Sequence, residues 1–182
     1  MIDLQPRNHI RNYIKNNLFI GVRTKPSLSN IIAPFVLYSG VAIGYGLLSG
    51  LFGFELIESE LIFILPITLF LFPSLLEEIV FRGLMIPIDT REKGFKGILG
   101  YTLSSTALFV LWHPLNALTI NQGAQAFFFD GRFLFIVSLL GLVCSYSYIY
   151  SKSIWVPAMI HWLTVVVWVF FLGGRNLLLE LR

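Results

Sequence analysis

The sequence predicts an all-α protein, a polytopic bundle of about five transmembrane helices that follows an N-terminal amphipathic segment. Hydrophobic residues make up 56% of its 182 residues and charged residues only 13%, whereas a soluble domain carries about 25% charged residues. Several apolar runs exceed the roughly 18 residues that a helix needs to cross a membrane. The alternation of polar and apolar residues is too weak for a β-barrel. We therefore expect a single integral-membrane domain over residues 1–182.

Residues 1–30 form a basic segment that we expect to lie in the cytoplasm. Its basic residues are Arg7, Arg11, Lys15, Arg23 and Lys25. Apolar residues recur between Ile10 and Phe19 at nearly helical spacing, which indicates a short amphipathic helix on the membrane surface. The alternative is a flanking tail that only sets the topology.

Five apolar segments follow, and each is expected to span the membrane as a helix. They are residues 31–54, 61–87, 98–112 or a little beyond, 132–150 and 154–172. Glycines in the first segment are spaced for close helix packing. Pro66 and Pro73 should bend the second segment, and the third should end near His113 and Pro114. The more polar stretch 116–131 is expected to form a re-entrant or surface loop, and 151–153 a tight turn.

The distribution of Lys and Arg predicts the orientation in the membrane. Nine of them fall on the N-terminal side, in residues 1–30, in the connector 88–97 and at Lys152, and three fall on the opposite side, at Arg132, Arg175 and Arg182. This bias places the N-terminus in the cytoplasm, in the inner or plasma membrane of a cell. The orientation in the membrane explains why the basic residues lie in the loops, so these residues do not indicate binding to nucleic acid. The expected partner is the lipid bilayer.

Three ionisable residues, Glu77, Glu78 and Arg82, interrupt the second apolar segment. Each costs about 2.5–3.5 kcal/mol at the centre of a spanning helix on insertion scales, so such residues are functional-site candidates. Glu78 and Arg82 are four residues apart and can pair on one helical face. Glu77 is rotated by about 100°, so it can point into a cavity and act as a general base on water. The alternative is a buried ion network that only fixes helix register.

Two histidines in other apolar segments, His113 and His161, can complete a site with these carboxylates. An imidazole can orient a water, carry a proton or donate to a developing oxyanion. The sequence lacks the two-histidine helix of zinc proteases, and Asp89 and Asp130 both fall in loops. We expect no cofactor, although Glu77, Glu78, His113 and His161 could together hold zinc or iron.

These residues resemble motifs of the CPBP family, the CAAX prenyl endopeptidases and bacteriocin-processing (Abi) proteins. Residues 77–82 resemble its EExxxR motif, residues 109–113 fit its FxxxH motif, and His161 fits the histidine of its last motif. The resemblance covers about residues 61–174, the expected catalytic core. It implies a glutamate-dependent intramembrane endopeptidase, of a family earlier regarded as metalloproteases, that acts on membrane-embedded or lipid-modified proteins and peptides.

The resemblance also implies a role for each site residue. Glu77 with His113 would activate the attacking water, His161 would help to bind the substrate carbonyl and its oxyanion, and Glu78 and Arg82 would support Glu77. Phe109 and Thr164 are candidate substrate-binding residues. The family commonly has asparagine four residues after the last histidine, where this chain has Val165. Thr164, Asn116 or a backbone N–H would then have to supply the missing donor.

Two other functions are compatible with the same residues. A non-catalytic membrane immunity, scaffold or assembly protein could keep the polar cluster for fold specificity. A small proton-coupled transporter could use Glu77 as a relay, although the chain shows no inverted repeat. The sequence does not indicate the substrate, the cleavage position or the oligomeric state.

Overall fold

The computed structural model describes residues 6–174, with side chains from residue 11 onward. Arg175 and Arg182, which enter the orientation prediction, lie outside this range. Within it the chain forms helices and no β-strand, apart from one isolated bridge between Glu55 and Leu172. The prediction of an all-α bundle is therefore confirmed.

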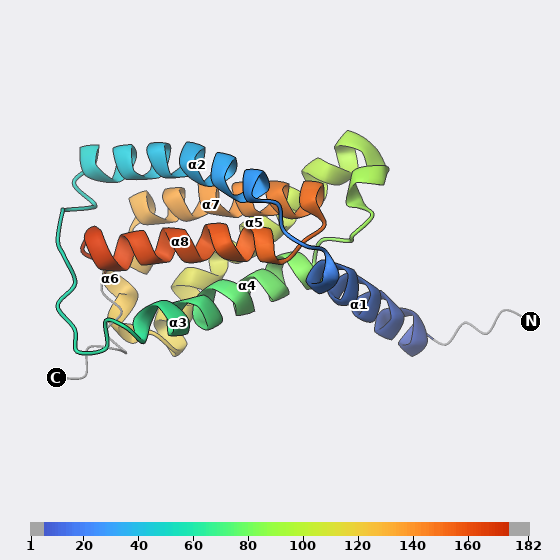
Figure 1. Cartoon of the computed structure of the whole chain (residues 1–182), viewed down its shortest axis with the longest axis horizontal. Helices are drawn as coiled ribbons and strands as arrows, with labels where there is room; N and C mark the ends of the chain where they lie inside the picture. Colours follow the sequence, from blue (N-terminus) through green and yellow to red (C-terminus); the bar gives the residue numbers. More distant parts are fainter. Residues whose placement is uncertain (1–5, 175–182) are drawn as a thin grey trace, which may run out of the picture.

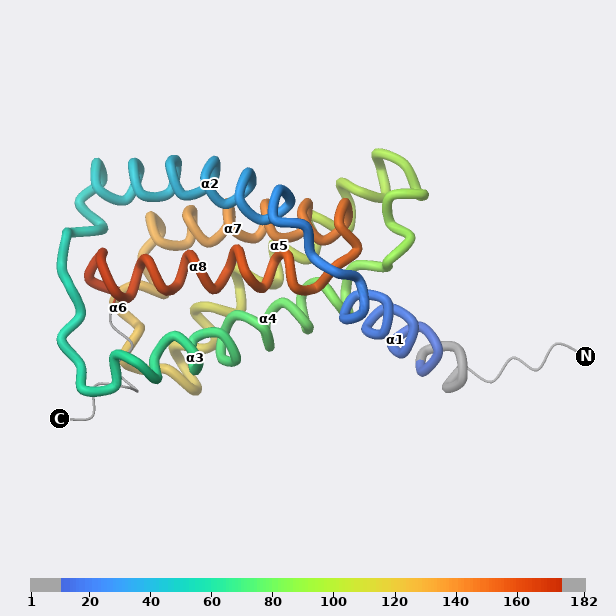
Figure 2. Tube along the Cα trace, in the orientation of Figure 1, coloured from blue at the N-terminus to red at the C-terminus, as the bar shows by residue number. Residues whose placement is uncertain are grey.

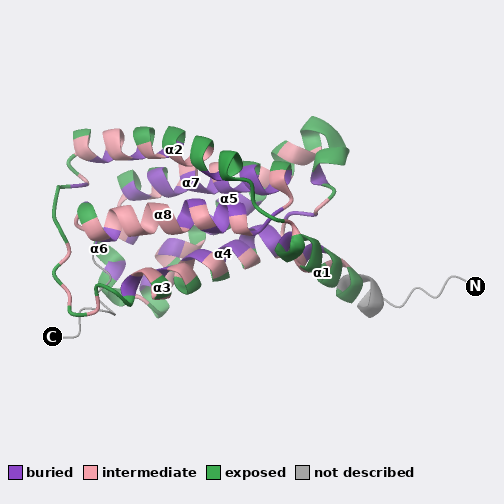
Figure 3. Ribbon diagram, in the orientation of Figure 1, coloured by how far each residue is buried: buried purple, intermediate pink, exposed green. Residues whose placement is uncertain are grey.

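Helix α7 (Gly131–Ser151) is the central element of the bundle. It packs against α2 (Leu28–Leu48), α5 (Gly94–Thr119) and α8 (Trp155–Phe171), and Figure 1 shows α2, α7 and α8 side by side. Figure 3 shows the outward faces of α2 exposed and much of α7 buried. Large apolar side chains cover the outward faces of α2 and α5. Such a surface suits lipid and not water.

Three described segments are long and apolar enough to cross a membrane. They are Leu28–Leu48, Thr90–Thr119 and Gly131–Ser151. Helix α8 is apolar but shorter, and the predicted second span is broken into several pieces. The structure therefore agrees with a helical membrane protein, while the number of five spans stays a prediction.

Most predicted helix boundaries are close to the observed ones, with three exceptions. The first span ends at Leu48 and not near residue 54, because the chain turns at Gly50 with a φ of 67°. The predicted end of the third span near Pro114 is wrong, since α5 continues to Thr119. Proline fixes φ in the helical range, and packed neighbouring helices allow it inside spanning helices. The predicted loop 116–131 instead contains helical turns.

These turns fold back onto the bundle. They are η4 (Gln122–Ala124) and α6 (Gln125–Phe128). Ala124 and Phe128 are buried in the main hydrophobic core. The segment after α5 therefore covers one end of the bundle.

The predicted second span is an irregular helix that carries the carboxylates. It consists of α3 (Leu65–Leu69), the π-helical η1 (Phe70–Leu75), α4 (Leu76–Glu78) and the π-helical η2 (Ile79–Leu84). Phe72 leaves helical geometry immediately before Pro73, as the steric restriction on a residue before proline favours, so the predicted bend there is confirmed. Pro66 lies in the first turn of α3, where proline is tolerated, and so it starts the helix instead of bending it.

Residues 49–64 link α2 to α3 across one end of the bundle, as the Cα trace in Figure 2 shows. The backbone N–H groups of Glu55 and Ile57 donate to the carbonyl oxygens of Phe171 and Phe170, each at 3.1 Å. These bonds satisfy carbonyl groups at the C-terminal end of α8 that have no partner within the helix. The linker is thereby held against α8.

The N-terminal helix α1 (Pro6–Arg23) docks on the far end of the irregular helix. Asn17 is 3% exposed. Its Nδ2 donates to the carbonyl oxygen of Ile86 at 3.1 Å, and its Oδ1 accepts from the backbone N–H of Ile88 at 3.2 Å. One amide therefore satisfies both a donor and an acceptor of the chain just after η2.

The last turn of α1 is bonded to the start of α8. The backbone N–H of Ile154 donates to the carbonyl oxygen of Gly21 at 2.9 Å, and the indole of Trp155 donates to that of Val22 at 2.8 Å. Both carbonyl groups belong to the last turn of a helix, which lacks internal donors. Helix α1 thus joins the ends of two elements that carry site residues.

We predict that Asn17→Ala destabilises the protein by about 1–3 kcal/mol, because it leaves buried backbone groups without partners. The free energy of unfolding in detergent micelles measures this loss. Asn16→Ala is the matched control, since Asn16 is the exposed neighbour on the same helix. Equal stability of the two variants would contradict the docking role of Asn17.

Candidate active site

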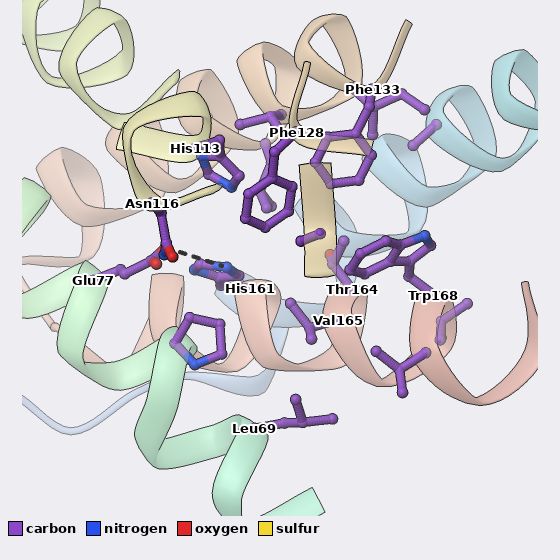
Figure 4. A pocket seen from close by; sticks show the side chains of 18 of the residues that line it. Leu69, Glu77, His113, Asn116, Phe128, Phe133, His161, Thr164, Val165 and Trp168 are labelled. Carbon is purple, nitrogen blue, oxygen red and sulfur yellow. Dashed lines mark ion pairs between the residues drawn. The ribbon is translucent and has the colours of Figure 1, made fainter. Parts of the chain in front are cut away.

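A cavity of about 310 Å³ lies between α2, α5, α7, α8 and the irregular helix. Most of its lining is apolar. Its polar lining includes Glu77, His113, Asn116 and His161. In the view of Figure 4 these four side chains gather at one end of the cavity, whereas Phe133 and Trp168 lie farther along it. The sequence separates these residues by up to 84 positions, and the bundle brings them to one space.

Glu78 and Arg82 form a fully buried ion pair behind this cavity. Arg82 Nη1 donates to Glu78 Oε1 at 3.1 Å, and both side chains are 0% exposed. Arg82 Nη2 donates to the carbonyl oxygen of Gly141 on α7 at 3.0 Å. The predicted i, i+4 pairing is present, and the guanidinium also ties the irregular helix to α7.

The same carboxylate holds His161. The Nδ1 of His161 lies 2.9 Å from Glu78 Oε1, and because a carboxylate accepts, this nitrogen carries the proton. The Nε2 of His161 then faces Glu77, with its nitrogen 4.0 Å from Glu77 Oε2. Glu78 therefore fixes both the orientation and the tautomer of His161.

Glu77 presents its carboxylate to the cavity with one oxygen engaged and one free. Its Oε1 accepts from the indole Nε1 of Trp112 at 2.9 Å. Its Oε2 has no hydrogen-bond partner among the described residues. The rotation between adjacent helix positions thus gives the two carboxylates different surroundings, and Glu77 is the one that a water in the cavity can reach.

Trp112 is a contact that the sequence analysis did not identify. It precedes His113 on α5 and donates to Glu77 from a different element of the chain. An indole N–H that is removed from water needs a hydrogen-bond acceptor. This requirement could have suggested that Trp112 has a polar partner. The identity of that partner depends on how α5 packs, and no sequence pattern gives it.

His113 lines the cavity from α5 and is 8% exposed. Its Nδ1 lies 2.9 Å from the carbonyl oxygen of Phe109 one turn earlier. A carbonyl can only accept, so Nδ1 donates and the Nε2 of the neutral ring is left as an acceptor. His113 therefore offers a base nitrogen for a water in the cavity.

Phe109 lies behind the histidines and not in the cavity. It is 0% exposed and does not belong to the cavity lining. Its ring lies edge to face with both imidazoles, at centroid distances of 5.0 Å from His113 and 5.5 Å from His161, and the Arg82 guanidinium lies 4.5 Å from its centroid. The expected substrate-binding role of Phe109 stays a prediction, and in this position the ring does not line the cavity. Phe109 instead supports the charged and aromatic groups around it.

Thr164 and Val165 both line the cavity from α8. The hydroxyl of Thr164 donates to the carbonyl oxygen of Ile160 at 2.8 Å. A substrate can therefore contact Thr164, but the proton of this hydroxyl is already used within the helix.

Close approach of α7 to the site depends on Gly141. A Cβ at this position would lie 2.8 Å from Thr106 Cγ2 and 3.3 Å from Phe109 Cδ1. The absent side chain lets the Gly141 carbonyl reach Arg82. Ser105 donates to the carbonyl oxygen of Phe81 at 2.7 Å, which satisfies a backbone acceptor in the π-helical η2.

The donor set does not fit a metal ion. In the described part of the chain, no three His, Cys, Asp or Glu side chains are arranged to hold one. The set of Glu77, His113 and His161 considered for zinc therefore lacks ligand geometry in the described residues.

We predict that Arg82→Met destabilises the protein by about 3–5 kcal/mol, because it leaves the buried Glu78 carboxylate without its cation. The free energy of unfolding in detergent micelles reports the loss. Lys93→Met is the control, since Lys93 pairs with Asp89 at 3.5 Å where both side chains are 40% exposed or more. Exposed pairs contribute about 1 kcal/mol or less. Similar losses in both variants would contradict the structural role of the buried pair.

Comparison with known proteins agrees with the motifs. A family model described as Type II CAAX prenyl endopeptidase Rce1-like matches residues 59–167, more than half of the chain. Neither a curated protein nor a solved structure gives a significant match. The matched region includes the two carboxylates, the arginine and both histidines. The chain therefore belongs to the Rce1-like family of CAAX prenyl endopeptidases, which are proteases of membranes.

Proposed function

We propose that this protein is an intramembrane endopeptidase of the glutamic type, in which Glu77 and His113 activate the water that hydrolyses a peptide bond. The single observation that carries the proposal is the shared cavity. Glu77, His113 and His161 come from three separate helical elements, and all line it. A buried ion network that served only to fix helix register would not require a cavity at these side chains.

The hydrolysis begins with a water between Glu77 Oε2 and His113 Nε2. Its oxygen forms a bond to the carbonyl carbon while its proton passes to the Glu77 carboxylate, and the carbonyl electrons move to the oxygen. The C–N bond then breaks, and Glu77 returns the proton to the leaving nitrogen. The products are a carboxylic acid, which keeps the second proton of the water, and an amine, and Glu77 regains its charge.

Glu77 and Glu78 have different roles in this mechanism. Glu78 already accepts from Arg82 and His161 at 3.1 Å and 2.9 Å, so it is a positioning residue. The free Oε2 of Glu77 faces His161 across 4.0 Å. Trp112 holds the other oxygen of Glu77 and so orients the carboxylate for proton transfer.

The cavity favours substrates with large apolar groups. Away from Glu77 it is lined by residues such as Phe128, Phe133, Ile136 and Trp168. The substrate is therefore a membrane-embedded or lipid-modified peptide or protein whose apolar group occupies this space. The name of the family points to a prenylated CAAX sequence as the first substrate to test.

The whole chain acts as one domain in this proposal, with residues 61–174 as its catalytic core. The contacts of α1 with the irregular helix and α8 support this view. The charge bias places α1 and the N-terminus in the cytoplasm. Phe52 and Phe128 line the cavity, and the segments that hold them, residues 49–64 and α6, lie at the opposite end of the bundle from α1 in Figure 1.

We predict that Glu77→Gln abolishes cleavage while the protein remains folded and abundant, because the amide cannot take a proton from water. Quantitative mass spectrometry compares membrane peptides in cells that carry the native chain or the variant. A farnesylated peptide that ends in a CAAX sequence is tested with the purified protein.

Glu92→Gln is the control for this change, since Glu92 is exposed and lies outside the cavity. It should leave every cleavage product in place. The proposal fails if the products persist in Glu77→Gln, which would favour a non-catalytic membrane protein.

We also predict that Glu60→Cys is labelled by a membrane-impermeant maleimide in intact cells, whereas Lys93→Cys is labelled only after permeabilisation. Both residues are exposed, and the segments that hold them, residues 49–64 and the turn Thr90–Lys93, lie at opposite ends of the bundle in Figure 1. The native Cys144 is buried and should not react. The reverse pattern would show that the N-terminus lies outside the cytoplasm.

A further inference from the structure

We propose that Asn116 is a catalytic residue whose amide N–H donates to the substrate carbonyl and to the oxyanion that forms from it. This inference rests on the proposed function, because it completes the same hydrolysis. It follows from an account of the hydrogen-bond donors around Glu77.

An oxyanion needs donors that are not already committed. In the described cavity, the indole N–H of Trp112 is donated to Glu77 and the hydroxyl of Thr164 to Ile160. A tetrahedral intermediate at Glu77 must therefore find its donor among the remaining polar groups.

The two histidines do not supply this donor while they are neutral. Each uses its Nδ1–H in a hydrogen bond, His113 to the Phe109 carbonyl and His161 to Glu78. The Nε2 of each ring is then an acceptor. His113 uses its Nε2 to accept a hydrogen bond from the attacking water. An oxyanion requires a donor instead.

Asn116 has the position and the freedom to donate. It lies three residues after His113 on α5, so the two side chains share one face of the helix. It lines the cavity, and Figure 4 shows its amide directed toward the end where Glu77 and His161 lie. Its Oδ1 is buried without a hydrogen-bond partner among the described residues, and its Nδ2, the donor of the amide, makes no hydrogen bond to a described residue either.

Buried polar atoms without a hydrogen-bond partner among the described residues also occur in Tyr38, Asn121 and Trp168, which line the same cavity. Trp168 follows His161 by seven residues, about two helical turns or roughly 10 Å along α8. Asn121 comes after the end of α5. Tyr38 comes from α2, whereas Asn116 shares a face of α5 with His113.

The donor acts on the first chemical step. As the water oxygen bonds to the carbonyl carbon, the carbonyl oxygen takes up the electron pair and its charge grows. The N–H of Asn116 stabilises that charge, and no proton is transferred from the amide. Loss of one such donor lowers kcat by about 10²–10³.

The test uses peptides whose release depends on Glu77, synthesised and assayed with purified protein. We expect Asn116→Ala and Asn116→Asp to lower kcat by about 10²–10³ with KM changed by less than about threefold. Gln122→Ala should retain kcat within about threefold, because this control removes an exposed amide that does not line the cavity. Unchanged melting temperatures show that the variants remain folded.

A second variant separates a donor from a structural role. Val165 lines the same cavity from α8, one turn after His161. We expect Val165→Asn to restore kcat of the Asn116→Ala protein by about tenfold or more, since it brings an amide to the cavity from another helix. A residue that only supported the fold would not be replaced in this way.

The outcomes distinguish the two proposals. If Glu77→Gln abolishes cleavage but Asn116→Ala retains full kcat, the role of Asn116 is wrong and the hydrolase stands. Failure of Val165→Asn to restore an impaired Asn116→Ala protein would also overturn the donor role. If no peptide depends on Glu77, the proposed function itself fails.

Discussion

The buried carboxylate of Glu78 is the group on which the architecture of the site depends. It accepts from Arg82 and from His161, and Arg82 in turn donates to the Gly141 carbonyl. An unpaired charge in such surroundings is strongly destabilising, whereas a paired and hydrogen-bonded one is tolerated. The network therefore holds the irregular helix, α7 and α8 in one arrangement, and in that arrangement Glu77 faces the cavity.

This arrangement gives adjacent residues different chemistry. Glu78 is fixed by two bonds to its Oε1, from Arg82 and His161, while Glu77 lines the cavity and its Oε2 lies 4.0 Å from His161 Nε2 without a hydrogen-bond partner among the described residues. The ring of Phe109 packs against the Arg82 guanidinium and both imidazoles and supports all three groups. The Glu77 carboxylate and the two imidazoles thus gather at one end of a largely apolar cavity, which suits a substrate whose apolar part binds beside the bond that is cleaved.

Local patterns in the sequence predict the elements that local rules determine. Helices α7 and α8 follow from apolar length, the bend at Pro73 from backbone sterics, and the Glu78–Arg82 pair from helical spacing. The extension of α5 through Pro114 was missed because tertiary packing overrides the local signal. The contacts of Trp112 with Glu77 and of His161 with Glu78 join distant helices, so they depend on how the bundle packs. Composition also gave no indication that residues 122–128 cover the cavity.

The central claim is that an acid and two imidazoles from distant helices share one hydrated space. An experimental structure of the protein in lipid nanodiscs, at a resolution that shows ordered water, tests it most directly. The account predicts a water within hydrogen-bond distance of both Glu77 Oε2 and His113 Nε2, with His161 on the same cavity. A dry site, or side chains too far apart to contact one water, would contradict it.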